Sequence, residues 1–145
     1  MCPEIFALAA AIFWSVGSAF GKKGMALAGL APEQGLFLRL GLSALILFLL
    51  VLPRLGQYAQ AWGTAEGKKG ILLILAFEGI VAGTLGMLAF YTALRRGELS
   101  RVVPLAFTTP LWGFLLGVAF FGEKVTFLKA GGVAALLLGI VLLNL

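Results

Sequence analysis

The stretch Arg101–Lys124, RVVPLAFTTPLWGFLLGVAFFGEK, decides the fold because it holds twenty-one consecutive uncharged residues (102–122). A helix rises about 1.5 Å per residue, so this run is long enough to cross the roughly 30 Å hydrocarbon core of a bilayer. Pro104 and Pro110 would break a soluble helix here, whereas in a membrane neighbouring helices and hydroxyls can satisfy the freed carbonyls. We therefore predict one kinked transmembrane helix at about residues 100–122, with Pro110 as its hinge.

The composition of the whole chain agrees with a membrane location. Of 145 residues, 61% are hydrophobic and 12% are charged, and the mean hydropathy is +1.08. A soluble domain carries about 45–50% apolar and about 25% charged residues, so this chain has too little polar surface to cover itself. No segment alternates apolar and polar residues as barrel strands do. The sequence predicts an all-α integral membrane protein.

Four further apolar runs predict helices at about residues 3–28, 33–52, 70–94 and 126–145. Together with the first run they make a polytopic protein with five transmembrane helices, in one domain over residues 1–145. The longest connection, Pro53–Lys69, is polar and is predicted to be a loop.

The N-terminus carries the single cysteine, Cys2, which excludes an internal disulfide framework and a CxxC or zinc site. No apolar segment precedes Cys2, so we do not expect a lipoprotein processing site. MCPEIF also lacks the basic start of a secretory signal, and we expect the first apolar run to remain as a helix.

Lysine and arginine are equally divided between the two sides of the predicted membrane, which bears on orientation. The N-terminal side receives Arg54, Lys68, Lys69, Lys124 and Lys129, and the opposite side receives Lys22, Lys23, Arg95, Arg96 and Arg101. The positive-inside rule needs an asymmetry between sides, and here there is none. Either the chain inserts in both orientations and pairs antiparallel, or local context or another protein sets one orientation.

Glycines recur four residues apart in three of the predicted helices. The pairs are Gly17/Gly21, Gly79/Gly83 and Gly113/Gly117, and the last helix adds Gly131, Gly132 and Gly139. Small residues at this spacing let helix backbones approach closely in a membrane. The pattern predicts a tightly packed bundle and carries no chemistry of its own.

Two charged residues, Arg39 and Glu78, lie well inside apolar runs. A charge near the middle of a bilayer costs at least about 2.5–3.5 kcal/mol on insertion scales, so each should face protein or water. One interpretation is that Arg39 binds an anionic group of a substrate while Glu78 carries protons. The alternatives are an Arg39–Glu78 ion pair with a structural role, or side chains that extend to the nearer interface.

Polar and aromatic residues share helical faces near the centres of three predicted helices. Helix 3–28 places Trp14, Ser18 and Lys22 four residues apart, and helix 70–94 aligns Thr84 with Tyr91. Helix 100–122 places Arg101, Pro104, Thr108 and Trp112 on one face. We predict that Trp14, Ser18, Tyr91, Thr108 and Trp112 line a substrate cavity, although such aromatic residues also anchor helices at interfaces or fill a core.

Several functions are disfavoured by what the sequence lacks. It contains no histidine, no phosphate-binding GxxxxGK[ST] and no HExxH or acidic cluster for a metal. No base stands beside Ser15 or Ser18 to activate a nucleophile. The basic residues lie at the ends of apolar runs, which fits lipid headgroups and not nucleic acid. We therefore expect no enzyme activity, no cofactor, no metal and no nucleic-acid partner.

Three stretches together resemble the EamA-like domain of the drug/metabolite transporter superfamily. They are AAIFWSVGSAFGKKG (10–24), FLRLGLSALIL (37–47), where Arg39 matches a family arginine, and the whole segment from Phe90 to Leu145. The last segment holds the Tyr-x-Ala-Leu end of one helix and the Gly-Glu at 122–123. The order and spacing of these features are more specific than any one of them.

The resemblance implies a transporter of small metabolites, such as amino acids, that works by alternating access in a prokaryotic inner membrane. Family members usually carry two such domains as an inverted repeat of ten helices, and this chain is similar to the single-domain members. The implied assembly is an antiparallel homodimer, in contact with membrane lipids and a small-molecule substrate. The alternatives are a subunit of a heteromeric membrane complex and a flippase for lipid-linked sugars without ion coupling.

Overall fold

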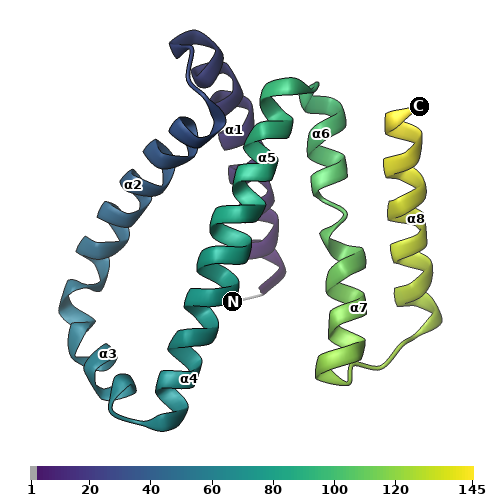
Figure 1. Cartoon of the computed structure of the whole chain (residues 1–145). Coiled ribbons are helices and arrows are strands. Elements are labelled where there is room, and N and C mark those ends of the chain that lie inside the picture. The colour runs from purple at the N-terminus through teal and green to yellow at the C-terminus, as the bar shows by residue number, and fades with distance from the viewer. Residues whose placement is uncertain (1–2) are drawn as a thin grey trace. The chain divides into compact units, whose positions relative to one another are not determined.

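The computed structural model describes residues 3–145, all of whose regular elements are helices (Figure 1). The elements, in chain order, are α1 (Pro3–Ala28), α2 (Pro32–Val51), the 3₁₀-helix η1 (Leu52–Arg54), α3 (Leu55–Trp62), α4 (Ala65–Leu73), the π-helix η2 (Ile74–Gly86), α5 (Met87–Arg96), α6 (Leu99–Ala106), α7 (Thr109–Phe121) and α8 (Phe127–Asn144). The prediction about Cys2 lies outside the described residues.

Five helical stretches are long and apolar enough to cross a membrane, which confirms the predicted number of spans. They are Pro3–Ala28, Pro32–Trp62, Ala65–Arg96, Leu99–Phe121 and Phe127–Asn144. The most apolar windows of these stretches have mean hydropathies between 1.5 and 2.5, as expected of helices that face lipid. The chain is a multi-pass membrane protein.

The predicted loop over residues 53–69 is wrong, because most of this stretch is helical. After η1 the chain forms α3 and then α4, with a short turn at Gly63 and Thr64 between them. The polar residues here are glutamine, glutamate and lysine, which favour helices as well as water. Thr64 caps α4 by accepting a hydrogen bond from the backbone N–H of Gly67 at 3.0 Å. The third span therefore begins at Ala65, five residues before its predicted start.

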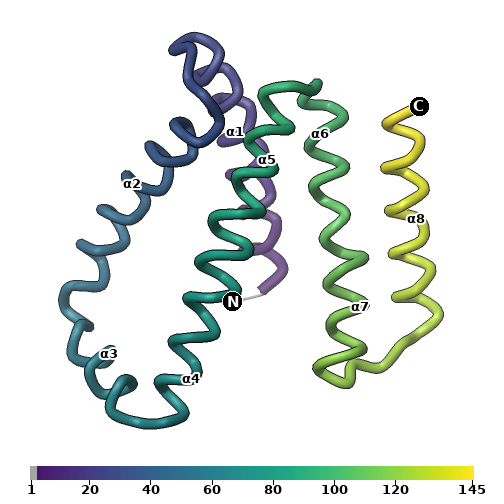
Figure 2. Tube along the Cα trace, in the orientation of Figure 1, coloured from purple at the N-terminus to yellow at the C-terminus, as the bar shows by residue number. Residues whose placement is uncertain are grey.

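The predicted bend in the fourth span is present, and it lies just before Pro110. Helix α6 ends at Ala106 and α7 begins at Thr109, which leaves a break visible in the tube of Figure 2. Proline has no N–H to donate to the residue four positions earlier, and it fits the first turn of a new helix. Because the break separates Pro104 from Thr108, the predicted polar face from Arg101 to Trp112 does not lie on one continuous helix.

The fourth span ends at a glycine C-cap. Gly122 has a φ of 64°, a left-handed conformation that a residue with a side chain rarely adopts. The backbone N–H groups of Gly122 and Glu123 both donate to the carbonyl of Gly117. The chain then runs without helix to Thr126, whose hydroxyl accepts from the N–H of Lys129 at 3.2 Å and starts α8.

The chain divides into two compact units. One unit comprises Gly17–Arg95, and its core consists of Met25, Leu36 and Tyr91, contributed by α1, α2 and α5. The other comprises the chain up to Val16 together with Arg96–Leu145, where α8 packs against α6 and α7.

Within the described chain, Gly21 lies against another helix at the Tyr91 hydroxyl, whereas the other glycines of the predicted pairs do not bring two helices together. A Cβ atom added to Gly17, Gly113, Gly131, Gly132 or Gly139 would meet no atom within 4 Å. At Gly79 and Gly83 the nearest atom is a carbonyl oxygen of the same helix, five residues earlier. Three of the five spans bury none of their most apolar window, and the other two, Pro32–Trp62 and Leu99–Phe121, bury 6%. Most apolar surface of the spans is left for lipid or for another chain.

Candidate functional site

The predicted site residues fall into both units of the structure. Ser18, Arg39, Glu78 and Tyr91 belong to the unit Gly17–Arg95, while Trp14, Thr108, Pro110 and Trp112 belong to the other unit. Each group is considered separately.

Arg39 of α2 reaches across to α5, where it contacts two side chains. Its guanidinium carbon lies 5.9 Å from the centroid of the Tyr91 ring, which is within range of a cation–π interaction. Its Nη1 atom donates to the sulfur of Met87 at 3.5 Å. A cation–π interaction at an exposed site stabilises by about 0.5–1 kcal/mol. The contacts hold the guanidinium in place without neutralising it, so its charge remains available to an anion.

Tyr91 is the buried centre of this cluster, with 8% of its surface exposed. Two glycines make room for it: its hydroxyl lies 3.8 Å from the position of a Cβ on Gly21, and its ring 3.5 Å from one on Gly35. Gly35 is also close to Met25, whose sulfur would lie 2.7 Å from an added Cβ. Helices α1 and α2 therefore approach the Tyr91 ring closely because these two positions carry no side chain.

Glu78 does not join this cluster, and the ion pair with Arg39 considered from the sequence is absent between these two residues. Arg39 contacts the chain at Met87 and Tyr91, nine and thirteen residues beyond Glu78. The ion pairs in residues 3–145 include Glu98–Arg101 and Glu123–Lys129, both exposed, and these do not involve Arg39 or Glu78. The structural interpretation of Arg39 and Glu78 as mutual partners is therefore wrong in this structure.

Glu78 lies instead in an unusual stretch of backbone, the π-helix Ile74–Gly86. A π-helix is rare and is mostly a single turn, often at functional sites, whereas this one extends over thirteen residues. The hydroxyl of Thr84 donates to the carbonyl of Gly79, five residues earlier, at 3.0 Å. A Cβ on Gly83 would come within 2.8 Å of the Glu78 carbonyl oxygen. Glycine at this position is therefore part of what allows the wider helix.

In the other unit, Trp14 of α1 packs against the ring of Phe107, at the break between α6 and α7. The ring centroids are 6.1 Å apart and the planes are tilted by 33°. Thr108 is half-buried at the same break, and its N–H donates to the carbonyl of Leu105 at 3.2 Å. Trp14 thus lies against the bent segment through its contact with Phe107.

The remaining predicted residues are Trp112, Pro110 and Ser18. Trp112 lies one turn into α7 with 58% of its surface exposed, and Pro110 is in the first turn of the same helix. Ser18 is half-buried on α1. A shallow apolar groove exists elsewhere, at the start of α2, and none of the predicted site residues lines it; its walls are Leu30, Glu33, Gln34, Phe37 and Leu38.

Sequence reasoning missed Met87 and Phe107 as neighbours of the predicted residues. Met87 lies four residues before Tyr91, so it shares a helical face with it, and this spacing was a usable signal. Phe107 could not be assigned to Trp14, because its contact depends on where the break in the fourth span falls.

Comparison with known proteins gives a family for nearly the whole chain. The EamA-like transporter family matches residues 2–145. The chain is 25% identical over 140 residues to the "Uncharacterized transporter YvbV" of Bacillus subtilis, covering 97% of this chain and 44% of that protein. It is 29% identical over 142 residues to the "Uncharacterized transporter in cobO 3'region" of Sinorhizobium sp, covering 97% of this chain and 94% of that protein. The chain thus spans less than half of the first relative and nearly all of the second. No solved structure matches it.

Proposed function

The chain belongs to the EamA-like transporter family, and from this premise we propose that it is a secondary transporter that moves small organic metabolites by alternating access. The substrates we propose are amino-acid-like or drug-like molecules. The membrane is the inner membrane of a prokaryotic cell, and the acting form is an antiparallel homodimer. The bacterial sources of the two relatives support this location.

The observation that carries this proposal is the position of Arg39. It lies about two turns inside the second span, and its contacts there are an aromatic ring and a thioether, neither of which is an anion. An intramembrane arginine without a carboxylate partner is costly unless a water-filled path or an anionic ligand reaches it. Arg39 therefore anchors the carboxylate or another anionic group of the substrate, and Tyr91 holds the guanidinium in position.

The test compares two arginine variants in proteoliposomes. Arg39→Gln should abolish uptake of a panel of labelled amino acids, because the anion loses its partner. Arg96→Gln removes the same charge at the end of α5, outside the apolar part of the span, and should retain uptake. Arg39→Lys keeps the charge and loses the planar fork, so it should weaken uptake without abolishing it. Full uptake by Arg39→Gln would refute the assignment.

The remaining cavity residues form the wall of the proposed pathway. Trp14, Ser18, Thr108 and Trp112 would shape the pocket, and the break before Pro110 would allow the fourth span to tilt between two states. The contact of Trp14 with Phe107 supports this, because it joins a predicted cavity residue directly to the break.

Glu78 is the proposed proton carrier. It is an exposed carboxylate within the third span, where a charge should face protein or water, and it lies in the π-helix Ile74–Gly86. Wild-type uptake should rise with an imposed pH gradient, and Glu78→Gln should take up substrate at a rate independent of that gradient. A Glu78→Gln protein that still responds to the gradient would exclude this role.

An antiparallel homodimer is supported by three independent observations. Lysine and arginine are divided five to five between the two sides, with Arg39 inside the membrane. Several helix glycines have no atom of this chain within 4 Å and are free to contact a second copy. The 140 matched residues make up 44% of the Bacillus subtilis relative, so that protein is long enough for two such segments.

Reporters at the C-terminus test the orientation. Green fluorescent protein is fluorescent only on the cytoplasmic side and alkaline phosphatase is active only outside, and we expect both fusions to report. Lys68→Gln with Lys69→Gln leaves three basic residues against five, so the C-terminal side should become cytoplasmic and phosphatase activity should fall. If only one wild-type fusion reports, the antiparallel homodimer is excluded and a heteromeric complex becomes the better explanation.

A further inference from the structure

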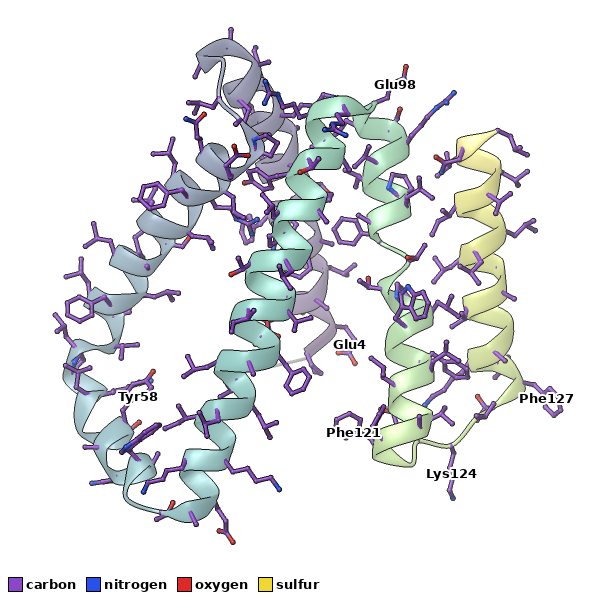
Figure 3. All side chains as sticks on the ribbon, viewed as in Figure 1. Glu4, Tyr58, Glu98, Phe121, Lys124 and Phe127 are labelled. Carbon is purple, nitrogen blue, oxygen red and sulfur yellow. The ribbon has the colours of Figure 1, made fainter. Side chains whose placement is uncertain are left out.

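The short helix α3 (Leu55–Trp62) is amphipathic, and its apolar side is not covered by the described chain. Leu55, Tyr58, Ala59 and Trp62 follow the i, i+3, i+4, i+7 spacing that forms one face of a helix. The exposed fractions are 46% for Leu55, 54% for Tyr58 and 50% for Trp62. Gly56, Gln57 and Gln60 form the opposite face. Leucine, tyrosine and tryptophan side chains thus share one face of α3. Tyr58 is labelled in Figure 3.

The position of α3 in the chain places it at the membrane surface. It forms the last eight residues of the stretch Pro32–Trp62, in which α2 alone has 20 residues. About 20 apolar residues suffice to cross a bilayer, so α3 follows the part of the stretch that crosses it. The span that follows, Ala65–Arg96, has 32 residues. The α-helical residues of α4 and α5 alone extend about 28 Å, so with the thirteen residues of the π-helix between them the span is longer than a hydrocarbon core of roughly 30 Å. Its first turns therefore extend into the headgroup region, and α3 lies beside them (Figure 1).

The corner between α3 and α4 is held by backbone hydrogen bonds. The N–H of Gly63 donates to the carbonyls of Ala59 and Gln60, and the N–H of Thr64 donates to that of Ala61. A Cβ on Gly67 would overlap the Ala61 carbonyl group. The close approach at Gly67 holds α3 at a defined angle to the start of the third span.

The charge around the corner is positive. Arg54 precedes α3, and Lys68 and Lys69 lie in α4, against a single carboxylate, Glu66. All four side chains belong to exposed residues. A short helix with an aromatic apolar side and neighbouring lysines is the form of an element that lies in the bilayer interface.

We propose that the α3–α4 corner (residues 54–69) is an interfacial lipid-binding element that recognises anionic phospholipids. Leu55, Tyr58 and Trp62 lie at the boundary of the acyl chains, where amphipathic rings are favoured. Lys68 and Lys69, with Arg54, bind the phosphate groups of the headgroups. The corner would thereby hold the second and third spans at a fixed depth, and this holds whether or not the transport proposal is correct.

The expected preference for an anionic over a zwitterionic lipid follows from the net charge of the corner, which is +2 because Glu66 offsets one of the three basic residues. Each basic residue near an anionic surface contributes about 1 kcal/mol, so a net charge of +2 corresponds to a preference of roughly thirty-fold at low ionic strength. The preference should fall with added salt, because the contacts are exposed.

The test measures quenching of Trp62 by brominated lipids around the full-length protein. Trp14→Phe with Trp112→Phe leaves Trp62 as the only tryptophan. In vesicles we expect brominated phosphatidylglycerol to quench its emission with a binding constant up to roughly thirty-fold above that of brominated phosphatidylcholine. Lys68→Gln with Lys69→Gln should abolish the preference. The matched control, Arg95→Gln with Arg96→Gln, removes two charges from the other end of the same span and should retain it.

A second measurement needs no tryptophan substitution. Amide hydrogen exchange of residues 55–62 in the wild-type protein should be slower in vesicles that contain phosphatidylglycerol than in phosphatidylcholine alone. Emission of Trp62 that neither lipid quenches would overturn the proposal; if that emission were also blue-shifted, protein covers α3 instead. Equal quenching by both lipids, a preference that survives Lys68→Gln with Lys69→Gln, or exchange independent of lipid charge would also overturn it.

Discussion

Replacing Gly83 with alanine tests the π-helix that contains Glu78. In the structure a Cβ at position 83 would lie 2.8 Å from the carbonyl oxygen of Glu78, closer than side-chain atoms normally approach. The carbonyl oxygen belongs to the backbone and the Cβ is bonded directly to it, so no side-chain rotation can relieve this contact. Gly79, in the same π-helix, provides the matched control, because its added Cβ would be 3.7 Å from the Ile74 carbonyl oxygen, an ordinary contact.

Two opposing contributions set the difference in free energy of unfolding between Gly83→Ala and Gly79→Ala. Alanine is favoured over glycine in a helix by about 1 kcal/mol, which both variants gain. Forcing an extra methyl group into occupied space costs typically about 1–3 kcal/mol, which only Gly83→Ala incurs. Gly83→Ala should therefore be less stable than Gly79→Ala by about 1–3 kcal/mol, which is roughly five-fold to over a hundred-fold in the unfolding equilibrium constant.

The assay is reversible unfolding of the purified protein in mixed micelles, with the free energy of unfolding obtained from circular dichroism as the denaturing detergent is increased. Gly70→Ala, where an added Cβ meets no atom within 4 Å, serves as a second control and should be as stable as the wild type or more so. If Gly83→Ala is as stable as Gly79→Ala, the carbonyl of Glu78 is not where a π-helix puts it, and the backbone at Ile74–Gly86 is α-helical.

Three further substitutions test separate features of the fold by the same unfolding assay. Gly35→Ala should destabilise by about 1–3 kcal/mol, because its Cβ would lie 2.7 Å from the Met25 sulfur, and a smaller loss would show that Met25 moves aside. Thr126→Ala should lower the free energy of unfolding by about 1 kcal/mol, because it removes the hydroxyl that accepts from the Lys129 N–H. Thr126→Ser keeps a hydroxyl and should retain most of the wild-type stability. Gly122→Ala should cost about 1–2 kcal/mol because of its φ of 64°, with Gly122→Asn less affected; equal stability of both variants and the wild type would contradict the left-handed cap.

The sequence by itself determined the five spans, the membrane location and the family. Hydropathy is summed along a local run of residues, so its signal does not depend on which helices touch. The bend near Pro110 was also predictable, because the lack of an N–H on proline is a property of that residue alone. The start of the third span was missed because glutamine, glutamate and lysine in Pro53–Lys69 suit both a solvated loop and a surface helix.

Only the tertiary structure decided which groups meet. Arg39 and Glu78 are two charges at plausible depth on neighbouring spans, and sequence alone could not exclude their pairing. The structure places Arg39 against Met87 and Tyr91 instead, because the glycines at 21 and 35 let α1 and α2 approach the tyrosine ring. The π-helix was equally hidden, since its hydrogen bonds join residues five apart and no side-chain pattern marks that spacing as distinct from four. Contacts and helix register depend on the geometry of several segments at once, and this information is not contained in any single stretch of sequence.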